Sequence, residues 1–119
     1  MEKSDLIIVK AHFKLYPTEE GGRKTPIISG YRPNHVFEYK DNSNDLVATY
    51  IGDINFEGQE FLSPGESILA TVRFLRHGDI DRFIQTGRIW WIHEALNKIG
   101  EAEIIEMPLW TYPQSSRLP

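Results

Sequence analysis

The chain has 119 residues, of which 40% are hydrophobic and 12% aromatic, enough for one globular domain with a packed core and too short for two. A formal net charge of -4 and a pI near 5.5 argue against a protein that holds nucleic acid by bulk electrostatics, because such binding depends on clustered Lys and Arg. The lack of cysteine excludes disulfides, thiolate nucleophiles and thiolate-bound zinc.

In the first half of the chain, extended runs alternate with turns rich in glycine, proline and asparagine. Residues 6–16 place apolar side chains at every second position, the period of a half-buried strand, and Pro17 ends the run because it has no backbone N–H. Residues 41–45 predict a turn, since Asn and Asp side chains satisfy nearby backbone groups. The extended segments expected here are 6–16, 26–28, 35–40 and 46–54, the last interrupted near Gly52.

In the second half, the clearest strand is Ser67–Leu75, whose apolar side chains share one face. Residues 80–85 are compatible with either a short helix or a strand. Trp90 and Trp91 occupy successive positions of a predicted strand and point to opposite faces. We therefore expect one in the core and the other at the surface, as a candidate contact for a partner. The remaining expected strands are 88–93 and 101–107.

Two features of the last third depart from simple alternation. Ile104 and Ile105 are adjacent apolar residues within a predicted strand, which indicates a β-bulge. Residues 93–99, HEALNKI, have the local propensity of a short helix, and a hairpin turn between two strands is the competing interpretation.

The spacing of these short strands, with glycine and proline turns between them, predicts an all-β sandwich or barrel. Residues 108–119 lack a pattern and are expected to form a tail, with Trp110 and Tyr112 against the body. The N-terminal segment lacks the apolar core of a signal peptide, and no run approaches the ~20 residues that cross a bilayer. We therefore expect a soluble, cytoplasmic protein without membrane association.

The stretch from Glu19 to Asn34, EEGGRKTPIISGYRPN, is unusually rich in glycine and proline, the residues with special backbone conformations. It combines two adjacent glycines, a Gly-Tyr-Arg-Pro turn and three cations between predicted strands. Residues 22–25 (GRKT) do not form a phosphate-binding loop, because arginine stands where glycine must precede the lysine and the first glycine of GxxxxGK[ST] is absent. We expect no GTP binding by this chain.

This stretch resembles the start of the third, C-terminal β-barrel domain of bacterial elongation factor Tu. That domain has a Glu-Gly-Gly-Arg-basic-Thr-Pro loop followed by a Gly-Tyr-Arg-Pro turn, which residues 20–26 and 30–33 match. Residues 63–68 (SPGESI) resemble the family's Met-Pro-Gly-Asp-Asn segment, and residues 92–100 (IHEALNKIG) are similar to a late family hairpin. The resemblance covers roughly residues 6–107.

The resemblance implies a fold and a choice between the two interpretations of residues 93–99. It implies a single closed antiparallel Greek-key β-barrel of about six strands in residues 1–107, followed by a tail in residues 108–119. It also implies a hairpin at residues 93–99, although Ala95 and Leu96 stand where the family has glycines.

The resemblance further implies candidate binding residues. In the family, the Gly-Gly-Arg loop lies toward the GTPase domain, whereas the residue after Gly-Tyr-Arg-Pro and the late hairpin touch the T-stem of aminoacyl-tRNA. Two family arginines are replaced here by His93 and Asn97, which predicts weakened tRNA binding because fewer phosphates are contacted. The implied candidates are Gly22, Arg23, Lys24 and Thr25 for docking, Asn34, His93 and Glu94 for tRNA, and Tyr31 and Arg32 of the turn itself.

Because the family barrel has no active site, the resemblance implies a non-catalytic binding module without a cofactor. Two functions stay open: a module that touches tRNA or a translation-factor partner, or a regulatory or decoy protein that has kept the barrel and lost RNA binding. In both we expect a protein partner. A plainer interpretation is that the glycines only set turn geometry and that Arg23 and Arg32 pair with local carboxylates. We expect no metal site, since the four histidines lack ligand spacing.

Overall fold

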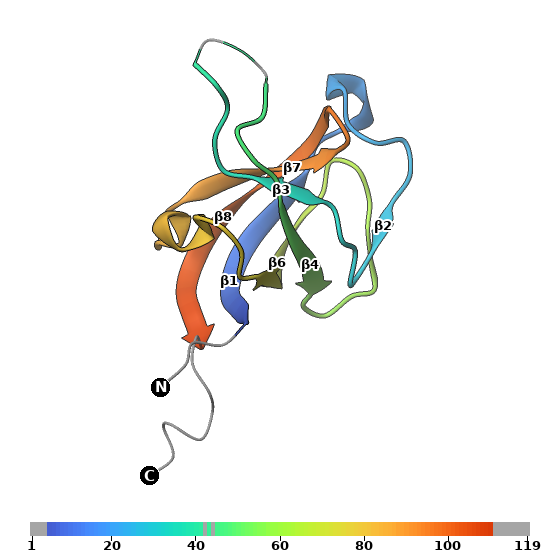
Figure 1. The fold of residues 1–119 in the computed structure, drawn as a ribbon. Coiled ribbons are helices and arrows are strands. Elements are labelled where there is room, and N and C mark those ends of the chain that lie inside the picture. Colours follow the sequence, from blue (N-terminus) through green and yellow to red (C-terminus); the bar gives the residue numbers. More distant parts are fainter. Residues whose placement is uncertain (1–4, 42, 44, 111–119) are drawn as a thin grey trace.

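Six antiparallel strands of the computed structural model, which describes residues 5–41, 43 and 45–110, close into a barrel (Figure 1). Their order around the barrel is β1-β6-β4-β3-β7-β8, and β1 closes it by pairing with both β6 and β8. The predicted all-β fold, a closed antiparallel barrel of about six strands, is confirmed. The barrel strands are β1 (Leu6–Leu15), β3 (Asn34–Val36), β4 (Tyr50–Phe56), β6 (Ser67–Leu75), β7 (Ile89–Glu94) and β8 (Asn97–Trp110).

Four short elements lie outside the barrel wall. A two-stranded sheet joins β2 (Ile27–Ile28) to β5 (Phe61–Leu62), and single 3₁₀ turns form η1 (Thr18–Glu20) and η2 (Ile80–Phe83). The segment 80–85 is therefore a short helical turn at its start. No helix in the described part of the chain has the length and apolar character needed to cross a membrane.

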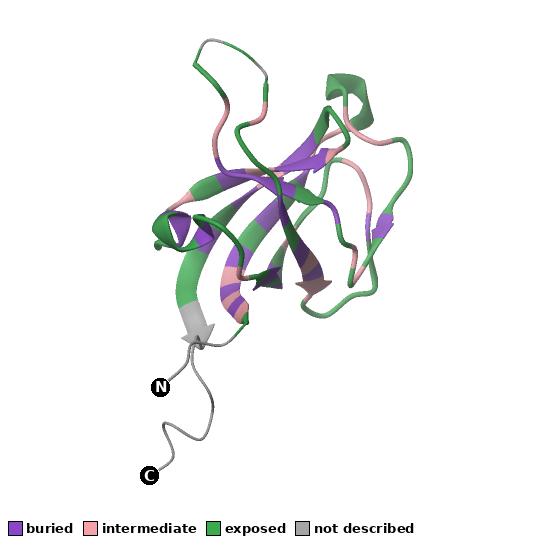
Figure 2. Ribbon diagram, in the orientation of Figure 1, coloured by how far each residue is buried: buried purple, intermediate pink, exposed green. Residues whose placement is uncertain are grey.

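The interior of the barrel is filled by alternate residues of its strands, which Figure 2 shows as bands along β1. At its centre the fully buried indole of Trp90 has its ring centroid 5.4 Å from that of Phe74 and 5.5 Å from that of Phe37. Trp91 is half-buried on the other face, so the predicted division between the two tryptophans is confirmed. Burial of each such side chain contributes about 1.5–3 kcal/mol, and this aromatic group is therefore a main source of stability.

Two predicted strand boundaries in the first half were wrong. The segment 46–54 becomes a strand only at Tyr50 and runs without interruption through Gly52. Glycine is required there for space, because a Cβ would lie 2.8 Å from the carbonyl oxygen of Arg73. The segment 35–40 is a strand only to Val36. The side chain of Phe37 still lies in the core, and the described residues 38–41, 43 and 45–49 then form an arm that leaves the barrel.

The late hairpin is confirmed: β7 and β8 are joined by a two-residue loop between the paired residues Glu94 and Asn97. The predicted bulge is confirmed too, because Lys10 pairs with Glu106 and Ala11 with Ile104, which leaves Ile105 as the extra residue.

The last strand is longer than expected. It continues to Trp110, which pairs with Ile8, whereas the sequence predicted its end at Met107. The rest of the expected tail, residues 111–119 with Tyr112, lies outside the described residues.

One buried polar group ties three barrel strands together. The indole N–H of Trp90 donates to Nδ1 of His35 at 2.9 Å, and Nε2 of His35 donates to the carbonyl oxygen of Gly52 at 2.9 Å. Both bonds require the neutral imidazole with its proton on Nε2, since Nδ1 acts as an acceptor. Complete burial lowers the pKa of His35 to about 4, against a small opposing effect of the Gly52 carbonyl.

We predict a loss of stability on acidification that depends on His35. Between pH 6.5 and about 4 the unfolded chain binds a proton at His35 that the folded chain excludes, so the free energy of unfolding falls as the pH falls, by about 3 kcal/mol in total. Urea denaturation at pH values from 7 to 4 measures this loss. The matched variant His35→Gln should have a flatter profile, and equal slopes for the two proteins would contradict the assignment.

Candidate functional site

The segment that follows β1 is shaped by two glycines with different constraints. Gly21 has a φ of +90°, which other residues seldom adopt, while nothing surrounds its Cβ position. Gly22 needs space instead, because a Cβ there would lie 2.3 Å from the carbonyl oxygen of Tyr16. Its N–H donates to the carbonyl oxygen of Pro17 at 3.1 Å. The two glycines allow the loop to fold tightly against the end of β1, which places Arg23 within reach of Glu94.

Arg23 joins this loop to the tip of the β7–β8 hairpin, 71 residues later in the chain. One carboxylate oxygen of Glu94 accepts hydrogen bonds from Nη1 of Arg23 and from the hydroxyl of Tyr31. Arg23 also donates from Nε to the carbonyl oxygen of Thr25 at 3.1 Å and from Nη2 to its Oγ1 at 2.9 Å. Burial, followed by the bond to Glu94, raises the pKa of Tyr31 to about 12. Figure 1 shows the hairpin tip beside the loop after β1, and we call this junction, residues 19–31 and 34 with residues 92–98, the corner.

The corner unites candidates that the sequence assigned to two separate surfaces. Arg23 and Thr25 belonged to the expected docking set and Glu94 to the expected tRNA set, yet they share one hydrogen-bonded network with Tyr31. Asn34 and His93 are direct neighbours across β3 and β7, with Asn34 exposed and His93 buried.

Two of the predicted cations stay outside this network. Lys24 is an exposed residue of the loop, and Arg32 is exposed beside β4. Gly22 acts through the backbone, as described above. The nine predicted residues therefore divide into a network of four (Arg23, Thr25, Tyr31 and Glu94), the adjacent pair Asn34 and His93, the loop glycine Gly22 and two separate cations.

Sequence reasoning missed a cluster of aromatic rings beside the corner. The arm places Tyr39 over the outer face of β7, with its ring centroid 5.2 Å from that of Trp91. The ammonium of Lys98 lies 4.9 Å from the Tyr39 ring and 5.6 Å from the Trp91 ring, within the range of cation–π attraction. The alternation of Trp90 and Trp91 was the available signal for this surface. Nothing local in the sequence places Tyr39 there, because the arm is not a strand.

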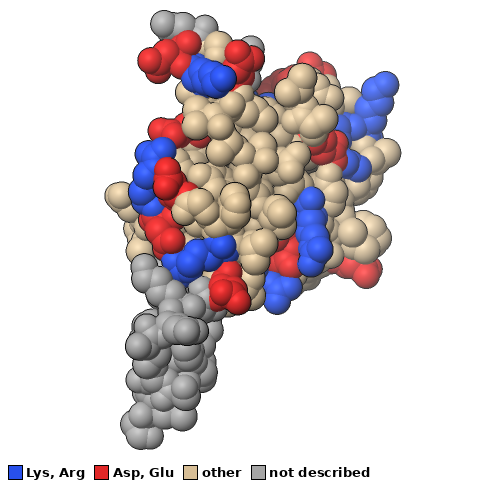
Figure 3. All heavy atoms as spheres, viewed as in Figure 1, with Lys and Arg blue, Asp and Glu red and all other residues tan. Residues whose placement is uncertain are grey.

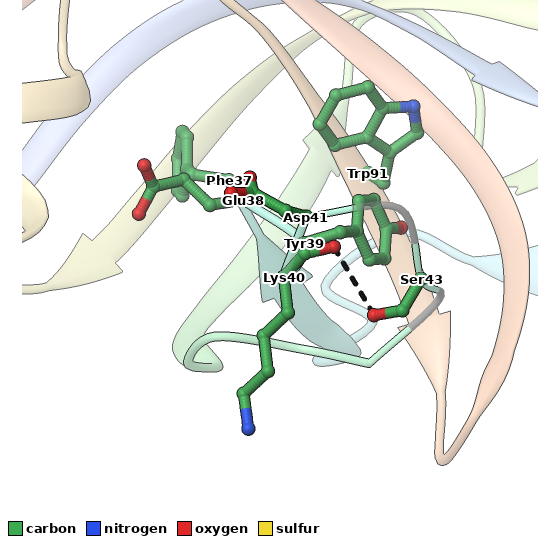
Figure 4. Close-up of a pocket in the computed structure, with 7 residues that line it drawn as sticks. All are labelled: Phe37, Glu38, Tyr39, Lys40, Asp41, Ser43 and Trp91. Atoms are coloured by element: carbon green, nitrogen blue, oxygen red, sulfur yellow. Dashed lines mark hydrogen bonds between the residues drawn. The ribbon is translucent and has the colours of Figure 1, made fainter.

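Tyr39 and Trp91 also line a shallow hollow of about 660 Å³ at the base of the arm. Figure 4 shows the two rings next to each other, while the side chain of Lys40 points away from Trp91 and its carbonyl oxygen accepts a hydrogen bond from Ser43. This hollow is open and has charged residues of both signs at its margin, Glu38, Lys40 and Asp41. It is a wide recess in the surface and holds no convergent set of polar groups.

His93 has an unsatisfied nitrogen at the base of the hairpin. Its Nε2 lies 2.6 Å from the hydroxyl of Tyr39, whereas its Nδ1 is buried and has no hydrogen-bond partner, alone among the buried side-chain nitrogens and oxygens of the described residues. Burial lowers the pKa of His93, polar interaction with the backbone of Ala95 and Leu96 opposes this, and the nearby charge of Lys98 lowers the pKa further. The backbone of the hairpin loop therefore lies close to this imidazole.

The tip of the hairpin is strained. Ala95 has a φ of +53°, the only positive φ at a non-glycine residue in the described ranges. Hairpin loops of two residues with a positive φ at the first position favour glycine there. Its neighbour Leu96 is 83% exposed, more than any other large apolar side chain described. The corner therefore ends in an unfavourable backbone conformation that displays a leucine to solvent.

These observations define a class of protein: a small closed antiparallel β-barrel whose late hairpin is tied to the loop after its first strand. Among its described residues, no group of three or more histidine or acidic side chains could hold a metal ion. No protein-family model matches the chain.

We predict that Ala95→Gly stabilises the protein. Glycine removes the left-handed strain of alanine, worth about 1–2 kcal/mol, and adds less than that in unfolded-chain entropy, so the free energy of unfolding should rise by about 0.5–1 kcal/mol. Urea denaturation measures the change. The control Ala48→Gly, at an exposed alanine with negative φ, should lower stability slightly. A lower stability of Ala95→Gly would contradict the strained tip.

Proposed function

We propose that this chain is a non-catalytic binding module that docks a protein partner through the corner. The observation that carries the proposal is Leu96, a leucine 83% exposed at a tip where the backbone of Ala95 is strained. Neither feature aids folding, since a leucine that is 83% exposed buries little area and a positive φ costs energy. Such strain is retained at binding sites, where the partner supplies the compensating contacts.

The charges of the corner favour a protein partner over nucleic acid. Arg23 forms an ion pair with Glu94, so its charge is already neutralised within the protein. The chain as a whole carries a net charge of -4. Figure 3 shows positive side chains lying among negative ones on the face it presents. Binding of a polyanion draws on clustered free cations, whereas an interface with a protein needs an apolar anchor with polar groups around it.

The resemblance to the C-terminal barrel of elongation factor Tu suggests the class of partner. In that family, the loop that corresponds to residues 20–26 faces a protein domain. A translation factor, or a protein that recognises one, is therefore the partner we propose. A regulatory or decoy role for the barrel uses the same surface and differs only in which of these proteins it binds.

Photo-crosslinking tests the corner directly. Benzoylphenylalanine in place of Leu96 should crosslink a discrete protein in lysate of the source cell, because the side chain sits in the proposed interface. The same probe at Phe61, which is 54% exposed on the small β2–β5 sheet, serves as the control and should not crosslink that protein. Identical products from both positions, or none from position 96, would contradict the proposal.

A matched substitution separates binding from folding. Leu96→Ser should leave the free energy of unfolding within about 0.5 kcal/mol of its original value, because the side chain is exposed. The same change should reduce recovery of the crosslinking partner at least tenfold. Equal recovery by both proteins would remove Leu96 from the interface.

Contact with tRNA is a second candidate, favoured by the position of Lys98. Its ammonium lies above two aromatic rings next to the hairpin and forms no ion pair within the described residues. Filter binding of charged tRNA across a salt series, with Lys98→Gln compared with Lys14→Gln, tests this function. Saturable binding at low salt that only Lys98→Gln weakens would support it, and the absence of saturable binding would exclude it.

A further inference from the structure

Away from the corner, the outer wall of the barrel carries an apolar row across β1, β6 and β4. Leu6 pairs directly with Leu75, and Ile51 precedes Gly52, which pairs with Phe74, so the three side chains lie side by side at the same end of their strands. Ile51 is 59% exposed and Leu75 is 42% exposed. They line a groove of about 420 Å³ together with Leu6 and Arg32, and a smaller hollow of about 150 Å³ continues it past Ile51 and Leu75.

A second row, of charged residues, runs parallel to the apolar one. Asp53 and Arg73 are direct partners across β4 and β6, and the guanidinium donates to both carboxylate oxygens at 2.9 and 2.6 Å. The hydrogen bond from Arg73 is the main reason why the pKa of Asp53 is lowered. The Asp53–Arg73 pair has no net charge, and both carboxylate oxygens of Asp53 accept a hydrogen bond from Arg73.

Arg32 adds a second cation beside the single carboxylate of Asp53, whose pKa its charge also helps to lower. The isolated bridge between Tyr31 and Ile54 places Arg32 alongside Asp53. Arg32 is exposed, and its guanidinium forms no hydrogen bond or ion pair with any described residue. Because Asp53 already holds Arg73 in a two-point contact, the groove has a net positive charge at the end where Arg32 lies.

We propose that this groove, defined by Leu6, Arg32, Ile51 and Leu75, docks an extended segment of a partner protein that carries apolar side chains and one carboxylate. The chemistry is complementary: the apolar row offers area to aliphatic side chains, and the planar guanidinium of Arg32 matches a carboxylate with two parallel hydrogen bonds.

The dimensions of the groove agree with an extended peptide. Neighbouring strands lie about 4.8 Å apart, so a row over three strands spans roughly 10 Å. In an extended peptide, side chains on one face repeat about every 6.7 Å. Two aliphatic side chains therefore cover the row, and the next residue on the same face reaches toward its charged end. The site is separate from the corner, so it does not depend on the function proposed there.

Titration of the full ¹⁵N-labelled chain with a defined pair of peptides tests the groove. The probe acetyl-Leu-Ser-Leu-Ser-Asp-amide presents two leucines and a carboxylate on one face, and its partner replaces Asp with Asn. The acidic peptide should cause saturable shifts of the amides of Leu6, Arg32, Ile51 and Leu75. The Asn peptide should bind at least tenfold more weakly.

Variants of the protein give the matched comparison. Arg32→Gln should weaken the acidic peptide at least tenfold, whereas Lys14→Gln, an exposed cation of β1 at the opposite end of the barrel, should not change its affinity. Arg32→Glu should prefer a peptide with Lys in place of Asp. Leu96→Ser should bind the acidic peptide as the original protein does, which separates this site from the corner.

Three results would overturn the proposal. The first is the absence of saturable shifts up to about 1 mM peptide, an affinity too weak to carry specific recognition. The second is a set of shifts located outside the groove. The third is equal binding of the Asp and Asn peptides, because the carboxylate would then contribute nothing.

Discussion

The pairing of β1 with both β6 and β8 is the constraint on which the rest of the structure depends. This pairing closes the sheet by joining the first strand of the chain to the last. It also places the loop after β1 next to the start of β8. Gly100 lies opposite Leu15, and the backbone N–H of Tyr16 donates to the carbonyl oxygen of Ile99 at 2.9 Å. The hydroxyl of Tyr16 then donates to Glu101 at 2.8 Å. With the loop fixed there, Arg23 reaches the hairpin, so the corner is a consequence of barrel closure.

The alternation of apolar and polar residues predicted those strands that have one buried and one exposed face over their whole length. The strand Ser67–Leu75 has the bounds expected from its alternation, and the bulge at Ile105 followed from two adjacent isoleucines. The hairpin at residues 93–99 was predicted from resemblance against a local helix propensity. Propensity fails there because long-range pairing with β1 and β7 outweighs the weak preference of so short a segment.

The sequence could not predict features that arise from contacts between distant segments. Gly52 looked like a strand break, whereas it is the residue that lets β4 approach Arg73 and the buried His35. The ion pair between Arg23 and Glu94 spans 71 residues, and neither residue signals the other. The sequence named most residues of the corner without showing that they form one surface. Arg32 was named for its motif, and its position beside β4 became evident only from the register of the strands.

Closure of the barrel also limits how any other molecule can associate with it. Over the paired length of each barrel strand, a neighbour lies on both sides and satisfies the backbone N–H and C=O groups. Within the described residues, edges without a partner strand remain at the small β2–β5 sheet and at the end of β8 beyond Ile104, which pairs with β1 alone. Along the rest of the wall, a segment that adds a strand would have to displace one that is already paired, so side chains form most of the surface that another molecule can contact.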